Sequence, residues 1–292
     1  MRLRRSELTG PGLRRRRRGR GFSYYGPDRE PITDPEVLDR IRALVIPPAW
    51  QEVWICPDPR GHIQAVGLDA AGRRQYRYHD AWRVKRDAAK FDHVLEVAAA
   101  LPRLRRAVDA GLAGRGLTRD RVFGAVATLL DHGGFRIGGE EYADADEAAY
   151  GLATLRRDQV RTRGDTMVFD YAGKGGQQVS QQVDDARIAS IVRALLRRRD
   201  PSPELFGYWT GQRWEDVRSA EINDYLREQA GIDITAKDFR TWHATVRAAV
   251  ELAQAGPVSS AAGRRRAAAA AIREVAELLG NTPTVARNSY VD

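Results

Sequence analysis

Cysteine and long apolar runs are the most conspicuous shortages in this 292-residue sequence. Cys56 is the single cysteine, which excludes an intrachain disulfide framework and favours a reducing compartment. The longest apolar run, Ala267–Ile272, is far shorter than the roughly 20 residues that a membrane span needs. No apolar stretch of about 7–15 residues follows the N-terminal arginines, so we predict no secretory signal. These shortages predict a cytoplasmic protein without a membrane partner.

The common motifs for nucleotides and metals are missing too. No Gly-x-x-x-x-Gly-Lys-Ser/Thr loop is present, because the stretch 173–176 lacks the upstream glycine and the downstream hydroxyl. The five histidines are scattered without metal-ligand spacing, and no carboxylate cluster indicates a two-metal nuclease. We therefore expect no cofactor, no bound nucleotide and no metal.

Lysine is scarce, whereas arginine is abundant. Lys85, Lys90, Lys174 and Lys237 are the only lysines, so a lysine is a better candidate than an arginine for chemistry that needs a releasable proton. Residues 1–22 carry +8 of the net charge of +9. Because their arginines would repel one another in a packed structure, we predict a disordered basic arm over residues 1–22. Its arginines suit phosphates, but a solvated tail without a specific role is an equal alternative.

Periodicity predicts an α+β fold with two domains after the arm. Residues 23–91 form the small β-rich domain, with a helix over 34–45 and strands over 53–56, 62–67 and 75–79. Residues 92–292 form a mainly helical domain, with helices over 92–109, 118–132, 184–198, 219–229, 237–255 and 265–279 and a short one from Thr282.

Within the helical domain, four segments break the helical pattern. Residues 152–155, 159–162, 166–171 and 177–183 are predicted as strands, with turns at 163–165 and 173–176. The last three predict an embedded three-stranded antiparallel sheet.

Cationic side chains stand in tight turns and near one helix start. Arg136 lies beside Gly138 and Gly139, and Lys174 lies on a glycine-flanked hairpin tip. Lys237 and Arg240 are three residues apart at the start of a helix, so they share a face and their charge adds to the helix dipole. Each residue alone is ordinary, but together they predict a site that handles phosphate.

The order of these motifs resembles type IB DNA topoisomerases of the poxvirus-like, bacterial branch. The matching motifs are Phe-Arg-Ile-Gly at 135–138, Gly-Lys-Gly at 173–175, Lys-Asp-Phe-Arg-Thr-Trp at 237–242 and Leu-Gly-Asn-Thr-Pro-x-x-x-Arg-x-x-Tyr at 279–290. The stretch 72–78 looks like that family's DNA-contacting strand. The resemblance spans residues 23–292, and it implies the tyrosine recombinase/topoisomerase IB fold.

The resemblance implies a catalytic role for each matched residue. Tyr290 would attack the scissile phosphate and form a 3′-phosphotyrosyl link, while Arg136 and Arg240 would hold the non-bridging oxygens. Lys174 would protonate the departing 5′ oxygen, and Lys237 matches the family's second lysine.

Other implied site residues contact DNA or depart from the family pattern. Asn281 stands where the family usually has a histidine, so it keeps a hydrogen-bond donor without a charge. Gln75, Tyr76 and Tyr78 would contact DNA from the N-terminal strand, and Tyr142 would lie on a helix that enters the major groove.

The resemblance further implies a monomer that clamps double-stranded DNA in the bacterial nucleoid. The broken strand would rotate about the intact one, and supercoils would relax without ATP or metal, because the tyrosyl phosphodiester conserves the bond energy. A tyrosine recombinase shares this chemistry, but it has His-x-x-Arg where this chain has Lys237-x-x-Arg240. A non-catalytic DNA-binding protein would leave Tyr290 and the cationic residues unexplained.

Overall fold

The computed structural model describes residues 2–132, 134–143 and 148–291, except the side chain of Tyr142. The chain divides into two compact units, Met1–Lys90 and Phe91–Asp292, which are described separately below as the N-terminal and C-terminal units. The mixed α+β fold expected from the sequence is confirmed.

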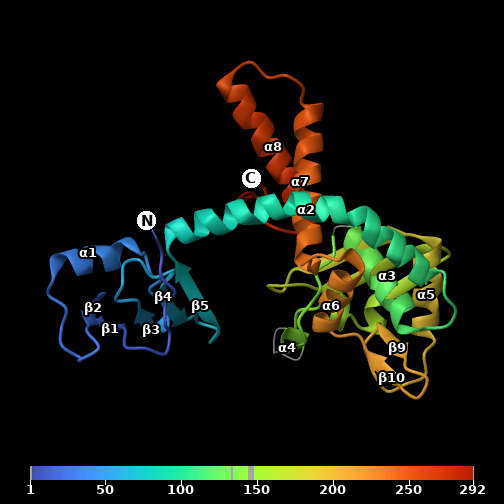
Figure 1. Ribbon diagram of the computed structural model, residues 1–292, viewed down its shortest axis with the longest axis horizontal. Helices are drawn as coiled ribbons and strands as arrows, with labels where there is room; N and C mark the ends of the chain where they lie inside the picture. The colour runs from blue at the N-terminus through green and yellow to red at the C-terminus, as the bar shows by residue number, and fades with distance from the viewer. Residues whose placement is uncertain (1, 133, 144–147, 292) are drawn as a thin grey trace. The chain divides into compact units, whose positions relative to one another are not determined.

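The N-terminal unit is built on a five-stranded antiparallel sheet with strand order β2-β1-β3-β4-β5 (Figure 1). Its helix α1 (Pro35–Ala43) begins as expected, because the Asp34 side chain accepts from the Glu36 amide and Pro35 occupies the first turn. Ile41 of α1 is buried and packs on one face of the sheet. The strands are β1 (Leu13–Arg18), β2 (Gly21–Tyr25), β3 (Gln51–Ile55), β4 (Ile63–Leu68) and β5 (Arg74–Tyr78).

The prediction of a disordered arm over residues 1–22 is wrong for the strand within it. β1 pairs with β2 from Arg14↔Tyr25 to Arg18↔Gly21. Arg15 donates to the carbonyl oxygens of Ile46, Pro47 and Trp50, at 3.2, 3.0 and 2.7 Å. The expected repulsion is relieved because successive side chains of a strand point to opposite faces and because backbone carbonyls and aromatic rings accept the guanidinium groups.

The C-terminal unit is mainly helical, and α3, which is buried along most of its length, packs against α5, α6 and α7. α2 begins at Asp80, earlier than the expected residue 92, and the other long helices match the expected segments to within a few residues. The helices are α2 (Asp80–Leu112), whose first residues up to Lys90 belong to the N-terminal unit, and α3 (Arg119–Asp131), α4 (Glu140–Ala143), α5 (Ala186–Leu196), α6 (Ser219–Ala230), α7 (Ala236–Gln254), α8 (Ala261–Leu279) and α9 (Pro283–Tyr290).

The embedded three-stranded antiparallel sheet is confirmed as β6 (Val160–Arg163), β7 (Thr166–Ala172) and β8 (Gln178–Asp184). The strand expected over 152–155 is wrong, because Leu152–Thr154 form a 3₁₀ turn. The amides of Leu152 and Ala153 donate to the carbonyls of Arg136 and Ile137, so this segment is tied to a loop rather than to a sheet. The hairpin of β9 (Gly207–Trp209) and β10 (Trp214–Asp216) was not expected.

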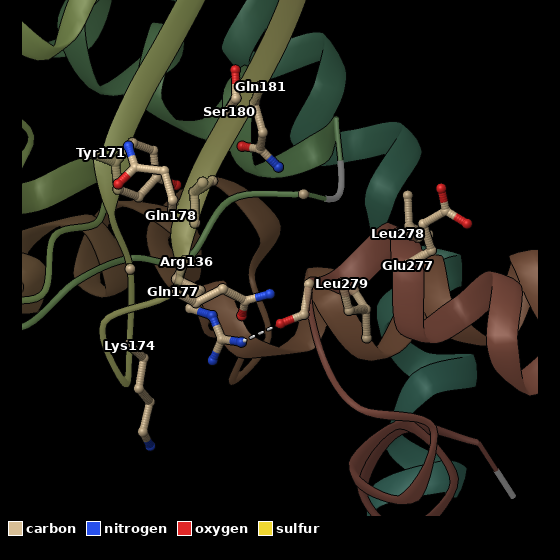
Figure 2. Close-up of a pocket in the computed structure, with 14 residues that line it drawn as sticks. Arg136, Tyr171, Lys174, Gln177, Gln178, Ser180, Gln181, Glu277, Leu278 and Leu279 are labelled. Atoms are coloured by element: carbon tan, nitrogen blue, oxygen red, sulfur yellow. Dashed lines mark hydrogen bonds between the residues drawn. The ribbon is translucent and has the colours of Figure 1, made fainter.

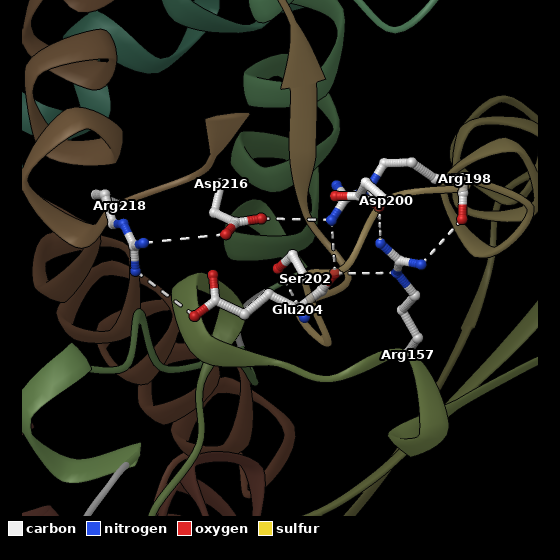
Figure 3. A network of polar contacts seen from close by, with 7 residues as sticks. All are labelled: Arg157, Arg198, Asp200, Ser202, Glu204, Asp216 and Arg218. Atoms are coloured by element: carbon white, nitrogen blue, oxygen red, sulfur yellow. Dashed lines mark hydrogen bonds and ion pairs between the residues drawn. The ribbon is translucent and has the colours of Figure 1, made fainter. Parts of the chain in front are cut away.

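A buried polar network fixes the segment that follows α5 to β10 (Figure 3). The Arg198 side chain is fully buried and donates to Asp200, to the Glu204 carbonyl and to Asp216 at 2.7, 3.0 and 3.3 Å. Arg157 donates to the Arg198 carbonyl and pairs with Asp200. A buried guanidinium group is tolerated only with such partners. These contacts therefore fix the position of the segment between α5 and β10. Among the described residues, no helix is long and apolar enough to cross a membrane.

Candidate active site

Arg136 lies in the loop that follows α3, and close backbone contacts fix this loop. Phe135 is buried and meets Phe169 of β7 edge to face, with ring centroids 5.0 Å apart. Gly138 has a φ of +79°, and a Cβ atom on Gly151 would lie 2.3 Å from the Gly138 nitrogen. Only glycine fits both positions. The close packing of Gly138 against Gly151 therefore fixes the backbone of the loop that bears Arg136.

Arg240 lies in α7, which begins with a reciprocal cap between Thr235 and Asp238. The residue is only 4% exposed. Its Nη1 donates to the Gly134 carbonyl at 3.0 Å and its Nη2 to the Leu279 carbonyl at 2.7 Å. Arg240 thereby joins the loop before Arg136 to the end of α8.

The link between α8 and α9 supplies the next two groups. Gly280 caps the C-terminal end of α8 in the left-handed conformation, and Thr282 caps the N-terminal end of α9, where its side chain accepts from the Val285 amide. The Nη2 atom of Arg136 donates to Asn281 Oδ1 at 2.8 Å. At the end of α9, Tyr290 is 8% exposed, and the Arg240 guanidinium carbon lies 5.6 Å from its ring centroid.

The site therefore gathers Arg136, Arg240, Asn281 and Tyr290, which the sequence analysis had matched from separate motifs. Neither arginine has a carboxylate partner among the described residues, since their hydrogen bonds go to backbone carbonyls, to the Asn281 side chain and to the Tyr290 phenol. Burial and repulsion by Arg240 lower the pKa of Arg136. A buried and a half-buried guanidinium group without a carboxylate partner favour the binding of an anion.

Two buried donors near the phenol lack a partner among the described residues. They are Arg240 Nε and Asn281 Nδ2. Buried donors are nearly always hydrogen-bonded in native proteins, so a pair of unused donors in one site indicates a missing acceptor. Phosphate oxygens are acceptors of this kind.

The Tyr290 phenol is tuned toward ionisation. Burial raises its pKa, but the charge of Arg240 and its polar contact with the phenol act the other way, together with Arg136 and Lys237. The net effect holds the pKa of Tyr290 below its ordinary value. A phenol in such surroundings is a better nucleophile at neutral pH than a tyrosine in water.

Lys174 stands at the tip of the β7–β8 hairpin, as expected. The turn is closed by the Gly173 amide, which donates to the Gln177 carbonyl at 2.8 Å, and Gly175 and Gly176 have positive φ. Lys174 and Arg136 line one cavity of about 170 Å³, but the lysine is exposed and its amine extends away from Arg136 (Figure 2). It makes no hydrogen bond or ion pair with the described residues, so its side chain is free to turn toward a ligand.

Lys237 lies in the first turn of α7 and is exposed, whereas Arg240 on the same helix is buried. Its contribution to the site is electrostatic, since it is one of the three cations that lower the pKa of Tyr290.

Sequence reasoning missed Tyr171 of β7. It is buried and lines the same cavity as Arg136 and Lys174. Burial raises its pKa to about 12, despite the opposing charges of Arg240 and Arg136, so the phenol stays a neutral donor. Its signal in the sequence is weak, because a tyrosine in an alternating strand is ordinarily a core residue.

An ionic contact behind the site also escaped sequence reasoning. Arg105 donates twice to Asp131, at 2.7 and 3.0 Å, and the His243 Nε2 atom lies 3.6 Å from the same carboxylate. Asp131 ends α3 and His243 follows Arg240 by one turn of α7, so the contact ties the two elements that position the arginines. No three His, Cys, Asp or Glu side chains of the described residues are placed to hold a metal ion.

The proposed DNA-contacting residues of the N-terminal unit divide between two faces of β5. Tyr76 and Tyr78 are 40% and 36% exposed, and their rings stack with centroids 6.1 Å apart. Gln75 points to the other face, where it donates to Asp69 at 2.9 Å. Tyr142 belongs to α4 of the C-terminal unit, but its side chain lies outside the described part of the structure.

Comparison with known proteins gives consistent matches over nearly the whole chain. The family described as "Eukaryotic DNA topoisomerase I, catalytic core" matches residues 79–291, and "Bacterial DNA topoisomerase IB, N-terminal domain" matches residues 21–69. DNA topoisomerase 1B of Acanthamoeba polyphaga mimivirus is 27% identical over 288 residues, covering 96% of this chain and 85% of the viral protein. DNA topoisomerase 1B of vaccinia virus (strain Copenhagen) is 24% identical over 229 residues, covering 77% and 69% of the two chains.

Among solved structures, the pre-cleavage complex of the XerH site-specific recombinase bound to difH substrate aligns with a TM-score of 0.41 and 15% identity. The alignment covers 66% of this chain and 49% of the recombinase chain.

Proposed function

This chain belongs to the type IB DNA topoisomerases, and we propose that its C-terminal unit cleaves and rejoins one strand of duplex DNA through Tyr290. The observation that carries the residue assignment is the position of the phenol beside two guanidinium groups that have no counter-ion, near two unused buried donors. The N-terminal unit supplies a second DNA-contacting surface through Tyr76 and Tyr78. The enzyme acts on double-stranded DNA as a monomer.

Cleavage is an in-line transfer of the phosphoryl group. The Tyr290 oxygen attacks the scissile phosphorus, its proton passes to solvent, and the bond between phosphorus and the 5′ oxygen breaks. The negative charge that builds on the non-bridging oxygens is stabilised by Arg136, Arg240 Nε and the Asn281 amide.

Lys174 donates a proton to the departing 5′ oxygen and recovers it during rejoining. A lysine can do this where an arginine cannot, because guanidinium holds its proton too tightly. The glycine-flanked hairpin tip lets the amine reach the leaving group once DNA is bound.

Rejoining reverses these steps. The 5′ hydroxyl attacks the 3′-phosphotyrosyl link and releases the phenol, so every bond that breaks is formed again and no nucleotide is consumed. Rotation of the free end between the two steps relaxes supercoils of either sign.

The test is incubation with supercoiled plasmid in EDTA without ATP, followed by SDS to trap covalent protein–DNA complexes. We expect relaxation and a trapped adduct with the wild-type chain. Tyr290→Phe, which removes one hydroxyl, should bind DNA but give neither. Tyr225→Phe is the matched control, because Tyr225 is buried against Phe123 in the same unit and outside the site, and it should behave as wild type.

An adduct formed by Tyr290→Phe would overturn the assignment of the nucleophile. Recombined products from paired sites, without relaxation of plasmids that lack such sites, would show a recombinase instead.

A further inference from the structure

The register of the five-stranded sheet places residues of β1 and β5 on one face, although they are far apart in sequence. Arg14 pairs with Trp54, Trp54 with Val66, and Val66 with Tyr76. Residues directly opposite each other on neighbouring strands project to the same side. Arg14 and Tyr76 therefore lie on the same face of the sheet.

Alternation along each strand extends this shared face. Arg16 and Arg18 follow Arg14 at two-residue steps, and Tyr78 follows Tyr76. The three arginines are exposed, and none forms an ion pair with the described residues. The Arg16 guanidinium lies over the Tyr25 ring at 5.1 Å, which orients it without neutralising its charge.

The opposite face of β1 is occupied by the core. Leu13 packs there with Ile41 of α1, and Arg15 is held by three backbone carbonyls and lies 4.0 Å over the Phe22 ring. Arg17 points to that opposite face as well and is exposed. Of the five arginines of β1, only Arg15 donates to backbone carbonyls among the described residues. Arg14, Arg16 and Arg18 share the face of Tyr76, whereas Arg17 lies on the opposite face.

The two rows on the shared face are separated by a covered strip. Trp54 is buried there, its Nε1 atom donates to the Gly10 carbonyl at 3.3 Å, and a Cβ atom on Gly12 would lie 2.0 Å from that nitrogen. Three strand spacings of about 4.8 Å place the arginine row roughly 14 Å from the tyrosine row. This separation is close to the roughly 12 Å width of the major groove of B-DNA.

We propose that Arg14, Arg16 and Arg18 form a row of phosphate contacts that extends the DNA-binding face of Tyr76 and Tyr78. The inference rests on the proposed function. It assigns these three basic residues to one face of the folded five-stranded sheet. The tyrosines contact the groove, and the arginines contact the sugar-phosphate backbone at its edge. Such contacts position the duplex and carry no sequence preference.

The test measures the salt dependence of binding to a labelled duplex by fluorescence anisotropy, between about 50 and 200 mM salt. Each phosphate contact contributes roughly 0.9 to the slope of log K against log salt. Arg16→Gln should lower the slope by about 0.9, and Arg14→Gln/Arg16→Gln/Arg18→Gln by about 2.7. When salt rises fourfold, the affinity of the wild-type chain falls by a certain factor. Each phosphate contact that a variant has lost makes this factor about 3.5-fold smaller.

Arg17→Gln is the matched control, because it removes the same charge from the next exposed position on the opposite face. Its slope should stay that of the wild type. The triple substitution to lysine keeps the charges and should also keep the slope, and thermal melting checks that each variant folds. The inference is overturned if Arg17→Gln and Arg16→Gln change the slope equally, or if the triple glutamine variant leaves it unchanged.

The proposed function is tested on the same duplex by the SDS-trapped adduct of the wild-type chain. An adduct with an unchanged salt slope in the triple glutamine variant would overturn this inference alone. Failure of the wild-type chain to form any adduct would overturn the proposed function.

Discussion

Lys174 offers the sharpest test of the chemistry, because its proposed role is entirely chemical. The side chain is exposed and makes no hydrogen bond or ion pair with the described residues. Removing it should therefore change the free energy of unfolding by no more than about 0.5 kcal/mol, as is usual for surface positions. Any large loss of cleavage rate then reports the reaction and not the fold.

We predict that Lys174→Ala and Lys174→Arg both slow single-turnover cleavage. General acid catalysis typically contributes about 10²–10⁴-fold, which corresponds to roughly 3 to 5 kcal/mol of the activation barrier. A role as a positive charge alone would leave Lys174→Arg close to wild type, because guanidinium supplies charge but no proton.

The assay compares ordinary DNA with DNA whose bridging 5′ oxygen is replaced by sulfur. A thiolate leaves without a proton, so the sulfur substrate should restore most of the rate of Lys174→Ala. Arg136→Ala should not be restored, since its defect lies on the non-bridging oxygens. If Lys174→Ala stays as slow on the sulfur substrate, relative to wild type, the acid is another residue, and Lys237 is the next candidate.

Two further predictions concern the phenol and the amide. The lowered pKa of Tyr290 predicts that single-turnover cleavage rises with pH with a midpoint below 10.0, the ordinary value. Arg136→Gln should move this midpoint to higher pH, because a charge that lowers the pKa is lost; a wild-type midpoint at or above 10.0 would contradict this. Asn281→Ala should slow cleavage about 10- to 100-fold, the cost of a hydrogen bond to a charged group. Asn281→Asp should be slower still, because it keeps the acceptor for Arg136 but replaces the free donor with a negative charge; a rate near wild type would show that Asn281 only orients Arg136.

Local signals in the sequence were enough for most of the helices and for the embedded sheet. Asp34 with Pro35, and Thr282 with Pro283, are caps whose hydrogen bonds form within one turn, so their effect does not depend on the rest of the chain. The strands β6 to β8 were found because turns with glycine separate alternating segments.

β1 could not be found in this way. Five consecutive arginines show no alternation of polar and apolar residues, and the strand exists because β2 and β3 provide partners for its backbone. The different environments of Arg15 and Arg16 are set by the two faces of a sheet that local sequence does not reveal.

For the candidate site, too, the sequence reveals some groups and not others. The order of the motifs in the sequence was enough to propose Arg136, Arg240, Asn281 and Tyr290 as members of the site. The groups that hold them are the carbonyls of Gly134 and Leu279, which every residue possesses and no motif marks. Tyr171 was missed because its place in the cavity follows from tertiary packing.

The two carbonyl bonds of Arg240 make catalytic competence depend on how the end of the chain is docked. One bond goes to the last residue of α8, immediately before the link that leads into α9 and Tyr290. A copy in which α8 and α9 detach loses an anchor of Arg240 in the same event that withdraws Tyr290, the proposed nucleophile. We therefore expect local unfolding of this end of the chain to abolish the start of cleavage in a single step, rather than to weaken it gradually.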